Sequence, residues 1–250
     1  NEAGTFIISG EADKDFIVSE LNNFFPSLFA GDNNFDNYVS GQTAWALTIN
    51  KIREADGNSS KDLVLNMDLS DIAIDVPPPI GKQKNEQREL VVRANLKNRR
   101  IDQLDIEYDS NVFTRFIVDN TEDLKIERVL VGLGQPYSGT DDQSDVSLQG
   151  KLEQLDVNQW IDFFNLRKTS HKQAGISRKS VHANLEIARL RLLGKDFNQV
   201  NVDLHKTSNG WSGHLDGNDI SGSVELISKN RLDKNRLLVR LEQLRIVKQD

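Results

Sequence analysis

The clearest pattern in the chain is an alternation of apolar and polar residues between Ser180 and Val247. Val200, Val202 and Leu204, for example, are separated by single polar residues. Successive side chains of a strand point to opposite faces, so this pattern predicts strands with one apolar and one wet face. Turn signals such as Asn209-Gly210 separate the runs, and Asn-Gly is typical of two-residue hairpin turns. The segment is therefore predicted to be an antiparallel meander.

The same alternation predicts strands through the rest of the chain, at residues 4–9, 39–52, 62–76 and 146–157 and in four runs between Leu90 and Leu133. The run Pro77-Pro78-Pro79-Ile80-Gly81-Lys82 is expected to interrupt the sheet, because proline cannot donate to a strand ladder. Polar, glycine-rich or basic segments at 31–37, 132–143 and 167–178 are predicted to be loops.

Two short helices are also expected. Asp13 precedes an amphipathic run that Pro26 stops after Phe25, and Asp156 precedes the run VNQWIDFFNL. Trp160, Phe163 and Phe164 of the second helix form an aromatic wedge. A helix of barely two turns is not stable alone in water, so we expect the wedge to pack against the apolar face or to plug one end of it.

About a dozen strands and two short helices make the fold class mainly β. So few helices cannot cover so many strands, so the sheet must fold over on itself, either as a closed β-sandwich or as an open trough. Periodicity is compatible with both arrangements. Without further information, the closed sandwich is favoured.

The candidate site follows from the alternation and is the apolar face of the predicted meander. The residues assigned to this face are Leu185, Ile187, Leu190, Leu192, Val200, Val202, Leu204, Leu215, Val224, Leu226, Leu237, Val239 and Leu241. Within the run 185–192, the apolar residues of this face lie at odd positions up to Ile187 and at even positions from Leu190. This shift by one residue predicts a β-bulge near Ala188.

Composition excludes several functions. The net charge of −7 with scattered basic residues argues against a nucleic-acid partner, and the absence of cysteine excludes thiol and zinc-thiolate chemistry. No apolar run approaches the roughly 20 residues of a membrane-spanning helix, and no signal peptide is present. The only methionine is Met67, which suggests a piece of a longer protein or a processed product.

No catalytic or metal site is predicted. His182 and His205 fall on the polar face beside Glu186 and Asp203, but a zinc site needs three or four converging ligands, and we interpret these as surface residues. The runs at Gly132–Pro136 and Gly81-Lys82 lack the ending of a phosphate loop and a following helix. No cofactor is therefore expected, and an enzyme is the least favoured class.

An ordered series of motifs resembles the AsmA-like proteins, the bridge-like lipid transport family of the YhdP and TamB type, and most closely YhdP. A strand ending in Leu155-Asp156-Val157 enters the helix with Trp160. Later come a strand closed by Asn209-Gly210-Trp211 and a step through Leu215, Gly217, Ile220 and Gly222. The runs VSGQTAW and PPPIGK fit the same family. The resemblance covers nearly the whole chain.

The resemblance implies a long curved antiparallel sheet that forms an open, apolar β-groove. It implies one continuous groove segment over residues 1–250, with a first part at 1–150 that holds the PPPIGK break and a meander at 151–250. Such proteins are periplasmic and anchored in the inner membrane, and they carry phospholipids toward the outer membrane and support its barrier. The expected partners are phospholipid acyl chains and the remaining segments of the full-length protein, with membrane contact only through parts absent from this chain.

Two non-enzymatic functions therefore remain from the sequence. The first is a lipid-carrying groove, and the second is a scaffold or partner-binding β-sandwich in the cell envelope. A glutamate in place of Val202 would be buried without a partner in a closed sandwich, but could reach water along an open groove. We expect Val202→Glu to be tolerated and to reduce the lipid that the chain carries.

Overall fold

The computed structural model describes most of the 250 residues, in the ranges 4–16, 19, 38–53, 59–98, 100–119, 125–139, 144–167, 180–192, 194–208, 210–227 and 236–244. The described residues form two compact units, with unit 1 extending to Leu130 and unit 2 beginning at Val131.

Unit 1 is built from antiparallel strands that the alternation largely predicts. They are β1 (Gly4–Asp13), β2 (Val39–Arg53), β3 (Ser59–Asp68), β4 (Ile72–Ile74), β5 (Glu89–Lys97), β6 (Arg100–Tyr108) and β7 (Val112–Asp119). The next strand, β8 (Lys125–Leu133), begins in unit 1 and ends in unit 2.

The single strand predicted at 62–76 is wrong, because the chain turns between β3 and β4. The Asp68 carboxylate accepts hydrogen bonds from the backbone N–H of Ser70, at 2.9 Å, and from its hydroxyl. The Ile72 N–H donates to the Leu69 carbonyl at 3.0 Å, which completes a tight turn. Such side-chain bonds to nearby backbone compete with the strand ladder. After the turn β4 pairs with the start of β2 instead of extending β3.

The first predicted helix is described only at its start. Residues 14–16 are helical, and the Phe16 N–H donates to Asp13 Oδ1 at 2.9 Å, so Asp13 caps the helix as expected. Most of the remainder of the prediction, up to Phe25, lies outside the described residues.

Unit 2 contains the predicted meander and the second helix. Its elements are β9 (Val146–Asp156), α3 (Val157–Arg167), β10 (Val181–Leu192), β11 (Lys195–Thr207), β12 (Gly210–Gly217), β13 (Ile220–Ile227) and β14 (Arg236–Leu244). Thr207 pairs with Gly210, so the hairpin turn falls at Ser208-Asn209, one residue earlier than predicted. The conformation of Asn209 lies outside the described residues.

One pairing departs from an antiparallel meander, because β9 and β10 run parallel. A parallel pair needs a long crossover, and α3 with the residues after it supplies one. The strand starts are fixed by a reciprocal clamp. Asp145 Oδ2 accepts from the Ser180 N–H at 2.6 Å and from the Ser180 hydroxyl at 2.9 Å. The Val146 N–H donates to the Ser180 carbonyl at 3.0 Å.

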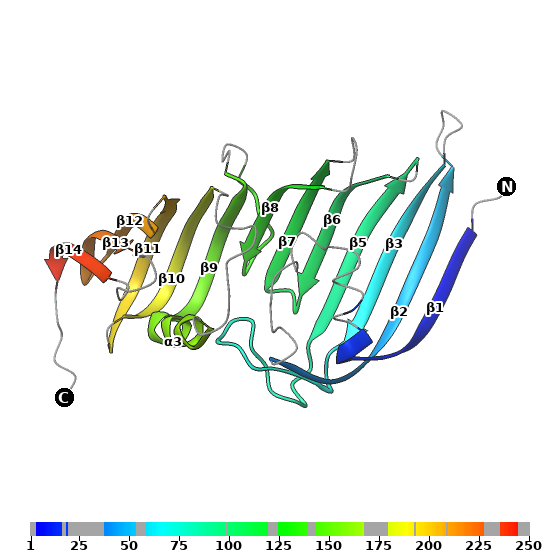
Figure 1. Ribbon diagram of the computed structural model, residues 1–250, viewed down its shortest axis with the longest axis horizontal. Helices are drawn as coiled ribbons and strands as arrows, with labels where there is room; N and C mark the ends of the chain where they lie inside the picture. The colour runs from blue at the N-terminus through cyan, green and yellow to red at the C-terminus, as the bar shows by residue number, and fades with distance from the viewer. Residues whose placement is uncertain are drawn as a thin grey trace. The chain divides into compact units, whose positions relative to one another are not determined.

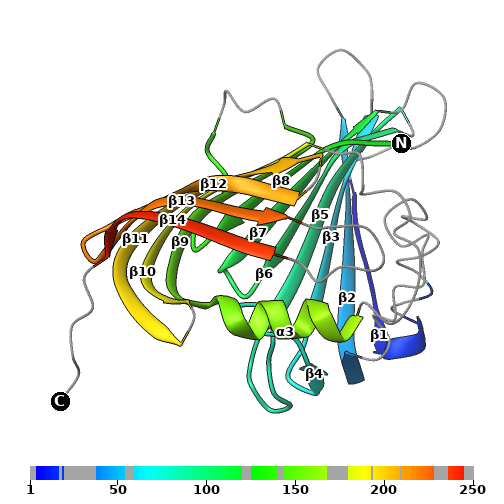
Figure 2. The same cartoon turned by 60° about the vertical axis from the view of Figure 1, so that its left-hand side comes forward.

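Helix α3 begins as the sequence predicts. Asp156 Oδ1 accepts from the N–H groups of Asn158, at 2.9 Å, and Gln159, at 3.2 Å. The helix contacts β10 and lies at one end of β9 and β10 (Figure 2). No helix within the described ranges is long and apolar enough to cross a bilayer.

Strand pairing confirms the mainly β fold class. The strands follow the order β1-β2-β3-β5-β6-β7-β8-β9-β10-β11-β12-β13-β14 in one 14-stranded sheet, with β4 off this path (Figure 1). The order has two ends, so the sheet is open and mostly antiparallel. The closed sandwich that periodicity alone favours is not formed.

Candidate functional site

Unit 1 presents a continuous apolar face that crosses five strands. Strand register aligns the face in rows, and one row joins Ile8 and Leu47 to Leu65, Val92 and Ile106. The rows on either side have the same apolar character. The unit 1 face consists of Phe6, Ile8, Trp45, Leu47, Ile49, Leu63, Leu65, Met67, Leu90, Val92, Ala94, Leu104, Ile106 and Tyr108.

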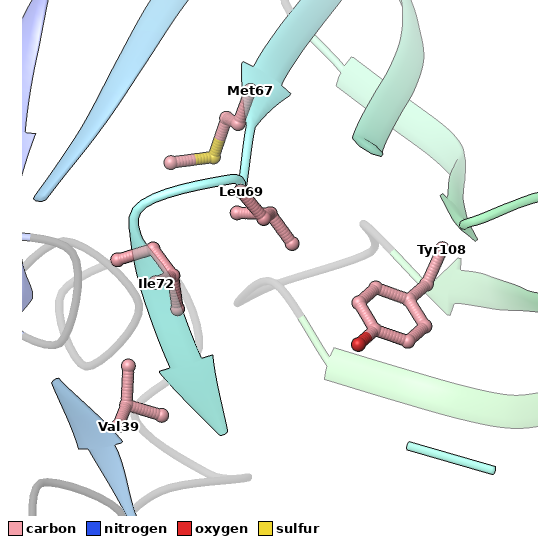
Figure 3. Close-up of a cluster of buried hydrophobic side chains, with 5 residues drawn as sticks. All are labelled: Val39, Met67, Leu69, Ile72 and Tyr108. Atoms are coloured by element: carbon pink, nitrogen blue, oxygen red, sulfur yellow. The ribbon is translucent and has the colours of Figure 1, made fainter. Parts of the chain in front are cut away.

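One end of the unit 1 face is covered by β4 and the segment before it. Val39, Met67, Leu69, Ile72 and Tyr108 form a buried cluster there (Figure 3). Trp45, Leu65 and Leu90 of the face pack against this cluster. The turn at Asp68–Ser70 and the pairing of β4 with β2 together place β4 over this end of the face.

Away from this cluster the unit 1 face is more accessible. Leu47, Ile49, Leu63 and Val92 are half-buried. On β1, Phe6 is 55% exposed and Ile8 is 52% exposed. Contiguous exposed apolar surface on a soluble protein marks a binding surface more often than a scattered apolar residue does.

The PPPIGK run supports the covered end through Lys82. The Lys82 side chain is 3% exposed, and its Nζ donates to the carbonyls of Leu69, at 2.8 Å, Gln83, at 2.9 Å, and Ile72. Burial lowers the pKa of Lys82 from its ordinary value of 10.5. The ammonium group therefore ties the turn before β4 to the loop after it. This agrees with the interpretation of Gly81-Lys82 as a loop.

Arg88 and Tyr108 fasten the same loop to β6. The Tyr108 hydroxyl donates to the Ile80 carbonyl at 2.7 Å and accepts from Arg88 Nη1 at 3.1 Å. Arg88 Nη1 also donates to the Pro79 carbonyl at 3.1 Å. Burial raises the pKa of Tyr108 above its ordinary value of 10.0.

The opposite face of unit 1 carries cross-strand ion pairs. Arg93 on β5 pairs with Glu107 on β6 at 2.7 Å, and Arg115 on β7 pairs with Asp105 at 2.7 Å. At one end of this face a cavity of about 420 Å³ is lined mainly by polar groups, among them Asp68, Arg88 and Glu107. Its polar lining does not suit an apolar ligand, so the cavity does not belong to the unit 1 face.

In unit 2 the strand register brings most of the predicted site residues together. One row joins Leu185, Val202 and Leu215, and Ile187 pairs with Val200. These residues are buried, as are Leu190 and Leu192, while Leu204 and Val224 are half-buried. Pairing of β13 with β14 puts Leu226 opposite Leu237, Val224 opposite Val239 and Gly222 opposite Leu241. The side chains of Leu226, Leu237, Val239 and Leu241 lie outside the described ones.

The buried apolar residues of β10 do change from odd to even positions after Ile187. The predicted β-bulge, an extra residue in one strand only, is not the cause. The registers Ile187↔Val200 and Arg189↔Asn198 are continuous, so neither strand gains a residue relative to the other. Gln199, which lies opposite Ala188, has a positive φ of 54°. The alternation therefore shifts by one residue in both strands at the same point, Ala188 and Gln199. The apolar residues before and after this point lie on the same face.

The aromatic wedge is partly visible. Trp160 and Phe163 are half-buried, and their rings meet edge to face with centroids 5.8 Å apart. The Phe164 side chain lies outside the described residues. The contact of α3 with β10 is compatible with packing against unit 2, and the plugging role stays a prediction.

The polar face of unit 2 holds His182 and His205. His182 Nε2 lies 3.2 Å from Asp203 Oδ2, and Lys151 pairs with Glu186 at 2.6 Å. His182 and His205 are cross-strand partners. In the described part of the chain no three His, Cys, Asp or Glu side chains converge in a way that could hold a metal ion.

The lining residues named from the sequence all come from residues 185–241, and the aromatic wedge comes from α3, so the unit 1 face was missed as part of the site. The signal for it was present, since Trp45, Leu47 and Ile49 alternate as regularly as Val200, Val202 and Leu204. Register was the missing information, because alternation shows that a strand has an apolar side but not which strands align.

A comparison with protein-family models matches residues 8–250 to the family described as YhdP protein. No curated protein and no solved structure matches the chain. The match includes all the strands except the first four residues of β1, and it includes the PPPIGK run that supports the covered end of the unit 1 face. The chain therefore belongs to the YhdP family.

Proposed function

We propose that this chain is a segment of a periplasmic, bridge-like protein that carries phospholipid acyl chains along its apolar sheet faces, between the inner and outer membranes. In this role it supports the permeability barrier of the outer membrane. The observation that carries the proposal is the unit 1 face, on which apolar residues align across five strands. Most of these residues are half-buried or exposed, and only Met67, Leu104 and Tyr108 among them are buried.

An acyl chain binds such a face without directional contacts. Each methylene group moved out of water contributes about 0.8 kcal/mol, so several methylene groups on half-buried leucines and valines give useful affinity. No bond of the lipid needs to be broken, and the proposed function is therefore transport without catalysis. Family membership supports this proposal, because the resemblance to lipid-carrying proteins rests on the same stretch of chain.

The predicted lining residues of unit 2 have a different role in the proposal, because several of them are buried. Val200 and Ile187 are buried, so an acyl chain there must replace contacts that the side chains already make. We propose that lipid occupies the accessible rows of the unit 1 face first and reaches the unit 2 lining residues only by such replacement.

The test is recovery of lipid from the purified 250-residue chain after incubation with phospholipid vesicles, by solvent extraction and mass spectrometry. Leu63→Asn changes the apolar face, and Val64→Asn is a matched control. Both residues are half-buried neighbours on β3, but they point to opposite faces. We expect Leu63→Asn to reduce the recovered phospholipid and Val64→Asn to leave it unchanged.

Equal lipid recovery from the two variants, or no lipid on the unmodified chain, contradicts the proposal. Circular dichroism and thermal melts of both variants show whether each remains folded. A chain that carries no lipid but captures a second protein through the exposed apolar residues of β1 supports the scaffold function instead.

A further inference from the structure

Two lysines lie at the accessible end of the unit 1 face. Lys51 on β2 and Lys61 on β3 are directly opposite each other, two residues beyond Ile49 and two before Leu63. Side chains alternate along a strand, so both lysines share the apolar side of the sheet with these residues. Lys51 Nζ lies 5.6 Å from the centre of the Phe6 ring, which belongs to the same face.

This arrangement of charges is unfavourable by itself. Like charges directly opposite on neighbouring strands destabilise a sheet. Both lysines are exposed, and no ion pair joins either to an acidic side chain in the described ranges. The neighbouring Asp62 points to the other face, where its carboxylate accepts from Asn95 at 2.5 Å.

The usual explanation for lysines on strands does not apply. Lysine often protects the edge strand of a sheet from pairing with other chains. Both β2 and β3 are interior strands that are paired on each side. The two lysines therefore do not protect an edge strand, and their position at the end of an apolar face needs another explanation.

We propose that Lys51 and Lys61 bind the phosphate of a phospholipid headgroup whose acyl chains lie on the unit 1 face. This inference rests on the proposed function and adds the class and orientation of the lipid. Directly opposite residues have Cβ atoms about 5 Å apart, so two ammonium groups can reach one phosphate. The phosphate relieves the repulsion between them.

The dimensions of the face fit this orientation. Lys51 lies six positions after Trp45, which packs against the buried cluster, and six residue steps along a strand span about 20 Å. The acyl chains of one membrane leaflet span about 15 Å, half the hydrocarbon thickness. A headgroup at the lysines therefore leaves room for its acyl chains before the end closed by β4, with the headgroup at the open end.

The experiment compares two ligands with the same short acyl chains, a phosphatidylglycerol and the matching diacylglycerol, by titration calorimetry on the full 250-residue chain. The test variant is the double substitution Lys51→Gln and Lys61→Gln. The control is Lys84→Gln with Lys151→Gln, which removes the same charge from exposed lysines outside the unit 1 face, Lys151 being on the polar face of unit 2. Glycerol phosphate alone is the third ligand.

We expect the test variant to bind phosphatidylglycerol about fivefold more weakly, as for two exposed ion pairs, and diacylglycerol as tightly as the unmodified chain does. The control should bind both lipids normally, and added salt should reduce the fivefold difference. The inference is overturned if the variant keeps its phosphatidylglycerol affinity or loses both lipids equally. It is also overturned if glycerol phosphate alone binds as tightly as the lipid. Failure of the unmodified chain to bind either lipid overturns the proposed function itself.

Discussion

At the scale of single residues, Lys82 is a buried lysine that takes no part in the proposed lipid site. Its ammonium group is satisfied by three backbone carbonyls. A buried charge is stable only when hydrogen bonds replace its lost hydration. Lys82 therefore holds two loops together at the point where they close the unit 1 face.

Lys82→Met should destabilise the chain by about 2 kcal/mol, because the substitution keeps the aliphatic stem but leaves buried carbonyls without a donor. Chemical denaturation measures the change in the free energy of unfolding. Lys84→Met is the control, since Lys84 is exposed and makes only a long surface ion pair with Asp71 at 3.9 Å. Equal stabilities of the two variants are the outcome that contradicts a structural role for Lys82.

Tyr108 gives the chain a pH dependence in the alkaline range. Burial raises its pKa in the folded chain above the ordinary value of 10.0, so the unfolded chain loses this proton first as the pH increases. The contribution of Tyr108 is fully present below pH 10 and decreases above it.

Tyr108→Phe should remove the part of the alkaline decrease in stability that comes from Tyr108. It should also lower the free energy of unfolding by about 1 kcal/mol at neutral pH, because the hydrogen bonds of the hydroxyl are lost. Denaturation series on both proteins at neutral and alkaline pH provide the measurement. A parallel decline in stability for the two proteins excludes Tyr108 as the source.

At the scale of elements, turns and close approaches decide where the strands go. β4 is only three residues long, and it pairs with β2 because the turn after Asp68 reverses the chain. Gly41 allows this pairing. It has a φ of 112°, and a Cβ at this position would lie 2.0 Å from the Asp71 carbonyl oxygen.

Gly41→Ala should therefore separate β4 from β2 and open the buried cluster at the end of the unit 1 face. We expect the free energy of unfolding to decrease by several kcal/mol, because the backbone strain of an alanine at position 41 adds to the loss of packing. Hydrogen exchange of the β4 amides reports the separation directly. Ala44→Gly, on the same strand and exposed, serves as the control for general effects on β2. Unchanged protection of β4 in Gly41→Ala contradicts the prediction.

Helix α3 depends on packing because an eleven-residue helix is marginal in water. Trp160 is half-buried and contacts Phe163 edge to face. Trp160→Ala should cost about 2 kcal/mol, below the range of about 3–5 kcal/mol for a fully buried tryptophan. A thermal melt tests this, with the exposed Gln159→Ala as control. An unchanged melting temperature shows that the helix does not contribute to the fold through Trp160.

At the scale of the whole molecule, both units carry an apolar face, but the faces differ in accessibility. The unit 1 face has half-buried and exposed rows, whereas Val200 and Val202 in unit 2 are buried. The proposed lipid therefore has more direct access to the unit 1 face, although Leu204 and Val224 of unit 2 are also half-buried. This difference changes one expectation from the sequence, the tolerance of a charge at Val202.

With Val202 only 6% exposed, Val202→Glu should destabilise the chain by several kcal/mol instead of being tolerated. Ile49→Glu, on a half-buried row near the open end of the unit 1 face, should remain folded and recover less phospholipid. Circular dichroism and lipid extraction on both variants test the contrast. A folded, soluble Val202→Glu chain contradicts the burial argument.

The sequence alone predicted most of the strands, the two helix starts and the apolar side of several strands. These follow from interactions between residues close in the chain. Alternation with a period of two places Val200, Val202 and Leu204 on one side, and the carboxylates of Asp13 and Asp156 cap helices a few residues away. The family resemblance that indicated an open sheet also came from the sequence.

Only the tertiary structure decided how these elements meet. Whether β3 continues or turns back as β4 depends on the pairing of β4 with residues more than thirty positions earlier. The parallel pairing of β9 and β10 depends on a crossover whose direction alternation does not encode. The opposed Lys51 and Lys61, and the carbonyls around Lys82, come together through register and loop packing. Such long-range contacts are set by the fold as a whole, and a local pattern of residue types does not specify them.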